Sequence, residues 1–167
     1  MPIDWTQLAR DVGSLHGHGE SGGTAFAQRA LERVIGEEAL RDAVELIAAH
    51  GPGTELTMNV LRHIGSRRAC EIAYETYRES NGDRASAAVW LIKHIANPVA
   101  VAWIAEFLDD HNVAGWGVGV LDQLLWCERV EPAEVEPLIA RAEEHPLENV
   151  REQAAFIRGY LARRPHA

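Results

Sequence analysis

The chain has 167 residues, a length that fits one domain and suffices to bury a hydrophobic core. Hydrophobic residues make up 47% and charged residues 25%, which is ordinary for a folded globular protein and excludes an intrinsically disordered chain. The formal net charge of −9 predicts repulsion of nucleic acid and anionic lipid and attraction of basic partners.

The first residues lack the basic start and apolar run of a signal peptide. No uninterrupted apolar stretch reaches the ~20 residues required to span a bilayer, so we expect a cytoplasmic protein with no membrane contact. Cys70 and Cys127 lie within apolar helical patterns, without CxxC or Cys/His ligand spacing. Both are expected to be buried, reduced thiols.

Apolar residues recur at three- and four-residue steps along most of the chain, and Gly or Pro interrupts this pattern between segments. This spacing predicts an all-α fold of about ten helices with almost no strand. The expected helices cover residues 3–12, 25–35, 37–49, 55–64, 67–79, 84–96, 98–108, 113–127, 132–145 and 148–162. Expected helix-capping residues are Thr24, Ser66, Asp83 and Asn97, the last followed by Pro98.

Residues 13–23 contain five glycines in eleven positions. Because glycine loses the most backbone entropy on ordering, we expect a mobile loop here. His16 and His18 within it could contact a metal ion, but two ligands on a mobile segment make a weak site, and we predict no metal or other cofactor. Residues 1–36 are expected to form an N-terminal cap on a single domain that covers residues 1–167.

An internal repeat is visible in the second half of the predicted helices. Ile64, Ile95 and Trp126 end successive helices at a constant interval of 31 residues (64, 95 and 126), and the same shift places Ile72 on Trp103. A fixed period of this length indicates helical hairpins that stack in series as an α-solenoid. The superposition predicts that Trp103 and Trp126 are core residues.

Two segments resemble a known repeat family. Residues 97–110 resemble the first helix of a HEAT repeat with its Leu-Asp-Asp turn, and residues 148–154 resemble the Val-Arg-x-x-Ala opening of a second helix. The resemblance covers about residues 37–162 and is closest in repeat length to the bilin-lyase-like HEAT subtype. It implies a concave surface lined by the second helix of each hairpin.

The alignment of the repeats predicts which residues line this surface. The stripe that is not needed for the core is mixed to basic with an apolar centre, whereas acidic residues concentrate on the first helices and turns. The predicted partner-binding residues are Asn59, Arg62, Ser86, Trp90, Lys93, Trp116, Leu121, Leu124, Arg151 and Arg158.

Gly115, Gly117 and Gly119 open the helix expected at 113–127. The segment follows a helix turn instead of a strand, and its glycine spacing does not fit a dinucleotide-binding loop. Each interior glycine costs a helix about 1 kcal/mol relative to alanine, so something must compensate. Two interpretations stay open: a neighbouring helix packs closely, or the bare helix face admits a ligand or a partner backbone.

The chain lacks His-Glu-x-x-His, Walker and Gly-x-Ser-x-Gly motifs, so we expect no enzyme. The favoured function is protein binding through the concave face, as a cytoplasmic adaptor or as an immunity protein that neutralises a toxin. One alternative is nucleic-acid binding related to the HEAT-like DNA alkylation-repair enzymes, which the net charge opposes. A bilin-lyase-like function is the other alternative, although no pigment-specific residue set is visible. The partner is expected to be another protein, and a homodimer is left open.

Overall fold

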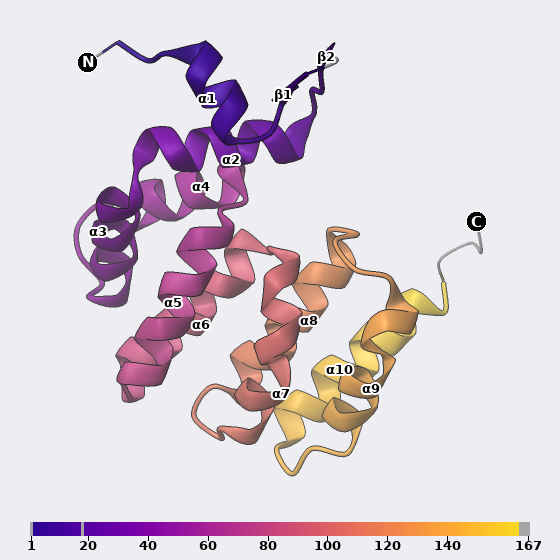
Figure 1. The fold of residues 1–167 in the computed structure, drawn as a ribbon. Coiled ribbons are helices and arrows are strands. Elements are labelled where there is room, and N and C mark those ends of the chain that lie inside the picture. The colour runs from indigo at the N-terminus through magenta and orange to yellow at the C-terminus, as the bar shows by residue number, and fades with distance from the viewer. Residues whose placement is uncertain (1, 18, 164–167) are drawn as a thin grey trace.

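The computed structural model describes residues 2–17 and 19–163, and these form ten α-helices, one 3-10 turn and one two-stranded ladder (Figure 1). The predicted all-α fold is confirmed. The helices are α1 (Trp5–Asp11), α2 (Thr24–Ile35), α3 (Glu37–Ala48), α4 (Thr54–Ile64), α5 (Arg67–Glu79), α6 (Gly82–Ile95), η1 (Pro98–Ala100), α7 (Val101–Asp109), α8 (Ala114–Trp126), α9 (Pro132–Glu143) and α10 (Glu148–Leu161). No helix within the described residues has the length and apolar character needed to cross a membrane.

The glycine-rich segment near the N-terminus contains a short hairpin where an irregular loop was predicted. Strands β1 (Leu15–His16) and β2 (Gly19–Glu20) pair in antiparallel fashion. The base of the hairpin is closed by Ser14, whose hydroxyl donates to the carbonyl of Ser21 at 2.7 Å. Gly13 turns the chain into the hairpin with a φ of 76°, which a larger residue rarely adopts. His18, one of the two histidines weighed as metal ligands, lies outside the described residues.

Two of the predicted caps also join neighbouring helices. Ser66 accepts from the backbone N–H of Ala69 at the start of α5, and its hydroxyl donates to Glu32 of α2 at 2.7 Å. Asn97 accepts from the N–H of Val99 and donates its amide to the carbonyl of Gly65 at 2.9 Å. A cap whose second hydrogen bond reaches another element fixes the position of that element as well as the helix start.

The other two predicted caps are wrong. Asp83 lies inside α6, whose N-cap residue is Asn81. Thr24 is the first residue of α2 and follows Gly23, which occupies the cap position.

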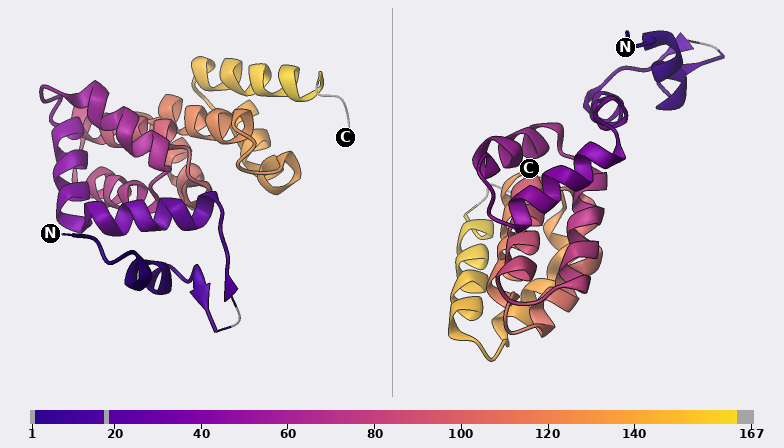
Figure 2. Two further views of the ribbon diagram at one scale, coloured as in Figure 1. Left: turned by 90° about the horizontal axis from the view of Figure 1, so that it is seen from above. Right: turned by 90° about the vertical axis from the view of Figure 1, so that its left-hand side faces the viewer.

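The helices from α3 onward pack mainly along a series. Helices α5 and α6, α7 and α8, and α9 and α10 pack as pairs, and α3 packs against α4. Across the pairs, α4 contacts α6, α6 contacts α8 and α8 contacts α10, while α3 contacts α5 and α7 contacts α9. Helix α1 and the hairpin lie at the opposite end of the molecule from α9 and α10 (Figures 1 and 2).

The hydrophobic core runs through the centre of this series. Its largest fully buried side chains come mainly from α3, α6, α7 and α8, and include Leu40, Ile92, Phe107, Leu121 and Leu125. The predicted core positions Ile64 and Ile95 are buried, with exposures of 7% and 2%.

Three predicted core positions differ from the structure. Trp126 is 63% exposed, and Cys127, expected to be buried, is also exposed. Trp103 is half-buried and stacks on Tyr74 with ring centroids 4.3 Å apart. The register explains Trp126: buried Leu91 and Ile95 of α6 correspond to buried Leu121 and Leu125 of α8 at an interval of 30 (91 to 121, 95 to 125). A one-residue shift rotates a helix position by about 100°.

Candidate binding site

The exposed apolar side chains of the helical series are confined to one set of helices. Within residues 37–163, all of which the structure describes, the large apolar side chains that stay exposed are Leu56, Val60, Trp116, Trp126 and Phe156. They lie on α4, α8 and α10, whereas α3, α5, α7 and α9 expose none of them. We call the solvent-facing sides of α4, α6, α8 and α10 the second-helix face. Exposed aromatic residues on one face are typical of an interaction surface.

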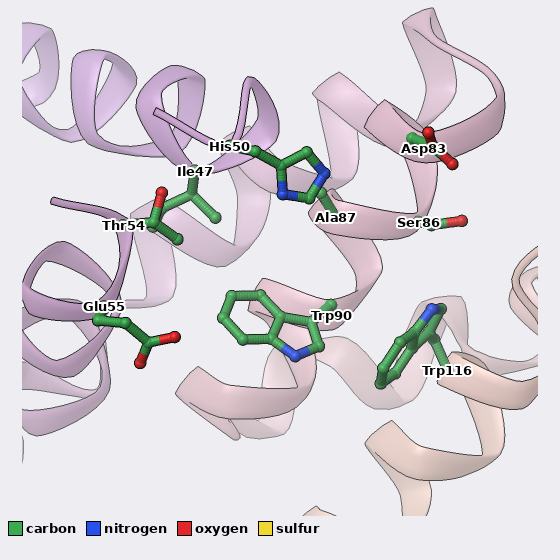
Figure 3. Close-up of a pocket in the computed structure, with 9 residues that line it drawn as sticks. All are labelled: Ile47, His50, Thr54, Glu55, Asp83, Ser86, Ala87, Trp90 and Trp116. Carbon is green, nitrogen blue, oxygen red and sulfur yellow. The ribbon is translucent and has the colours of Figure 1, made fainter. Parts of the chain in front are cut away.

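A hollow of about 340 Å³ lies on this face where α3, α4, α6 and α8 meet. Figure 3 shows Trp90 of α6 between Glu55 of α4 and Trp116 of α8, with His50 and Asp83 along the opposite rim. The full lining consists of Ile47, His50, Thr54, Glu55, Asp83, Ser86, Ala87, Trp90 and Trp116. Three predicted partner-binding residues, Ser86, Trp90 and Trp116, therefore converge on one cavity.

Lys93, a fourth predicted residue, lies directly beside the hollow. Its ammonium group is 5.6 Å from the centre of the Trp116 ring, a cation–π contact. The Lys93 side chain passes over Gly119, where an added Cβ would come within 3.2 Å of the Lys93 Cδ. The bare backbone at Gly119 thus gives the lysine stem a flat path across α8 to Trp116.

Trp90 is fixed from the side by a second aromatic contact. The His94 ring packs on Trp90 with centroids 4.4 Å apart. Burial lowers the pKa of His94 below its ordinary value, and the positive charges of Lys93 and Arg62 lower it further, while Glu55 opposes them. A neutral imidazole is therefore favoured beside the indole.

The two interpretations of the glycine segment apply to different glycines. A Cβ on Gly117 would lie 2.7 Å from the Cβ of Phe107, so close helix packing is confirmed there, between α7 and α8. Gly115 and Gly119 instead face flexible polar side chains, Asn149 at 3.1 Å and Lys93 at 3.2 Å. Those two glycines leave a bare strip along the exposed side of α8.

Beyond Lys93 the second-helix face continues toward α10. Asp122 accepts from the side-chain amide of Gln153 at 2.7 Å, and its other carboxylate oxygen is buried with no hydrogen-bond partner among the described residues. Burial raises the pKa of Asp122, and the charge of Lys93 partly opposes this. Farther along, Trp126 (63% exposed) and Phe156 (53% exposed) both pack against the Tyr160 ring.

Two of the remaining predicted residues are misplaced. Leu121 and Leu124 are fully buried, so the prediction that they line a binding surface is wrong. They were aligned with Trp90 and Lys93 at 31 residues, and the actual register of 30 turns them into the core. The exposed side of α8 carries Trp116, Gly119 and Trp126 in their place.

The other four lie on α4 and α10, outside the hollow. Asn59 and Arg62 are exposed on α4, and the Asn59 amide donates to the carbonyl of Glu55. Arg151 donates to the carbonyl groups of His145 and Pro146 at the start of α10. Arg158 pairs with Glu136 and Glu143 of α9, so the expected basic rim is neutralised at this position.

Sequence reasoning missed several residues of this site. Glu55, Asp83 and His50 lie at helix ends that meet only in the folded chain, so no local pattern marks them. Trp126 and Phe156 were overlooked because the register error placed Trp126 in the core. The spacing from Gly119 to Asp122 to Trp126, which follows one side of a helix, is the signal that could have revealed it.

No family model, curated protein or solved structure matches the chain. The described residues contain no group of three or more His, Cys, Asp or Glu side chains placed to hold a metal ion. The chemistry available on the second-helix face therefore consists of aromatic rings, two carboxylates in the hollow and scattered amides.

Proposed function

We propose that this chain is a non-catalytic protein-binding module, a HEAT-like α-solenoid that uses its second-helix face to bind another protein. The series of helix contacts, α4 to α6 to α8 to α10, supports this architecture because each hairpin of a solenoid packs on its neighbours. Within this function, a cytoplasmic adaptor or a toxin-neutralising immunity protein is the form that we favour.

The observation that carries the proposal is the exposure of Trp116, Trp126 and Phe156 on neighbouring helices α8 and α10. Aromatic side chains bury about 150–250 Å² each, so three rings exposed by roughly half leave on the order of 300 Å² of apolar surface in water. At about 25 cal/mol per Å², covering that surface would contribute on the order of 7 kcal/mol before the costs of association. Such a gain accounts for keeping large rings at the surface.

The charges of the same face favour a protein over nucleic acid. Arg158 is paired with two glutamates, Arg151 is engaged by backbone carbonyls, and Lys93 lies on the Trp116 ring. Nucleic-acid binding requires several cations free to neutralise phosphates, and the net charge of −9 adds long-range repulsion.

Affinity capture from an extract of the chain's own organism tests the proposal. The wild type is compared with a Trp126→Ala/Phe156→Ala double variant, which alters the face outside the hollow. A Trp5→Ala/Leu31→Ala double variant is the matched control, because it removes exposed apolar side chains from α1 and α2. Circular dichroism verifies that all three proteins keep the same helix content.

We expect one protein to be enriched by the wild type and by the control, and to be lost with the double variant. With the purified partner, calorimetry should show the dissociation constant rising at least about 30-fold, the effect of one hot-spot side chain of about 2 kcal/mol. Capture of nucleic acid, or of no protein that distinguishes the face variant from the control, would refute the proposal.

A further inference from the structure

The charged groups that line the hollow are all acidic. Of the described lining residues, Glu55 and Asp83 carry carboxylates, and neither lysine nor arginine is among them. Neither carboxylate has an ion-pair or hydrogen-bond partner among the described residues, whereas Glu37, Glu45 and Glu136 elsewhere are each paired with arginine. The hollow therefore holds negative charge that the protein itself does not neutralise.

The aromatic walls of the hollow also favour a cation. The face of an indole ring carries negative electrostatic potential and attracts ammonium and guanidinium groups within about 6 Å. The protein uses this attraction once, in the contact of Lys93 with Trp116. Trp90 has no cation over its ring among the described residues and lies near the centre of the hollow (Figure 3).

The size and floor of the hollow fit one long side chain. Its volume of about 340 Å³ is at the lower end of the range of about 300–1,000 Å³ for ligand pockets. Ile47 and Ala87 provide apolar surface below the carboxylates, and lysine and arginine stems pack well on such surface while their charged ends reach polar groups. The net charge of −9 draws basic partners toward the whole molecule.

We propose that this hollow receives a lysine or arginine side chain of the partner protein, with its stem against Trp90 and its cationic end held by Glu55 and Asp83. The inference rests on the proposed protein-binding function and names the chemistry that the partner presents at this point. The aromatic residues outside the hollow, Trp126 and Phe156, contact the rest of the partner.

Blocked tripeptides test the proposal with the full chain. N-acetyl-Gly-Lys-Gly-amide, its arginine counterpart and its uncharged norleucine counterpart are titrated while NMR follows the indole N–H signals of Trp90 and Trp116. We expect the lysine and arginine peptides to shift these two signals with millimolar dissociation constants. The norleucine peptide, which has a similar stem and no charge, should bind at least fivefold more weakly.

Matched variants separate the hollow from the charge of the whole molecule. Glu55→Gln/Asp83→Asn should weaken the lysine peptide about tenfold, whereas Glu38→Gln/Asp42→Asn, an equal charge change on exposed residues of α3, should leave the affinity unchanged. Trp90→Phe should keep most of the affinity and Trp116→Leu should reduce it, and the latter residue is exposed enough for the fold to survive.

Three results would overturn the inference: unmoved Trp90 and Trp116 signals, equal affinity for norleucine, or equal losses from the two acid pairs. If the peptides fail while the Trp126→Ala/Phe156→Ala variant still loses a captured protein, the inference is wrong and the binding function stands. If the peptides bind as expected and no protein is captured, the hollow recognises cations and the proposed function fails.

Discussion

Substituting alanine at Gly117 and at Gly119 gives opposite expected effects on stability, although the two residues lie on the same helix. At Gly117 the added Cβ would be 2.7 Å from the Cβ of Phe107 and 3.3 Å from its carbonyl carbon. Phe107 is fully buried, and its Cβ is attached to the backbone, so no rotamer change can relieve this contact. Helices α7 and α8 must separate by several tenths of an ångström in a closely packed interior.

Overpacking of this kind costs about 1–3 kcal/mol, and replacing glycine by alanine in a helix returns up to about 1 kcal/mol. Gly117→Ala should therefore lose about 1 kcal/mol in the free energy of unfolding. Gly119→Ala meets only the Lys93 Cδ at 3.2 Å, and a flexible lysine stem can move aside. That variant should gain up to about 1 kcal/mol, so the two should differ by about 2 kcal/mol.

Urea denaturation followed by far-ultraviolet circular dichroism measures both free energies directly. For a chain of this length, about 2 kcal/mol corresponds to melting temperatures separated by roughly 4–8 °C. If Gly117→Ala proves as stable as Gly119→Ala, then the close approach of α7 to α8 does not constrain this position, and the explanation of the glycine segment is wrong.

Three further predictions concern ionisable groups. Hydrogen bonds from Arg68, and then Arg41, lower the pKa of Glu37 from 4.5 to about 2, so its stabilising effect is complete above about pH 4.5 and is lost as the pH falls toward 2. Glu37→Gln should flatten the acid limb of a stability-against-pH curve from urea denaturation. Burial raises the pKa of Asp122, so its charged form destabilises the fold as the pH rises; Asp122→Asn should stabilise the chain more at pH 7 than at pH 4 in the same assay. Burial raises the pKa of Cys70 to about 12, so a thiol reagent should titrate only exposed Cys127 in the native chain and both cysteines after unfolding.

Local chemistry determined most helix ends, and those ends could be predicted from the sequence. Gly36 and Gly65 adopt positive φ at the ends of α2 and α4, which glycine tolerates and other residues resist. Asn97 followed by Pro98 starts a helical segment as predicted, because the asparagine side chain accepts a backbone N–H and proline lacks one. Signals of this kind act over a few residues and require no knowledge of tertiary packing.

The rotation of α8 could not be predicted in the same way. From Ala114 to Leu121 the helix has no polar side chain except the Trp116 N–H, so no polar stripe marks the side that faces solvent. The rotation is decided by contacts with α6 and α7, above all by Gly117 against Phe107. A single-residue error in the repeat interval therefore misplaced Leu121, Leu124 and Trp126 together.

The corrected rotation reverses the expected charge preference of the second-helix face. The stripe predicted from the sequence had a basic rim and suited an acidic partner. In the structure Arg158 is neutralised by two glutamates, while Glu55 and Asp83 remain unpaired in the hollow. An acidic partner would bring its carboxylates against these two and be repelled, whereas a basic side chain would replace solvent there with an attractive contact. The local charge of the hollow and the net charge of −9 then favour the same class of partner, so long-range attraction would bring that partner to a surface able to hold it.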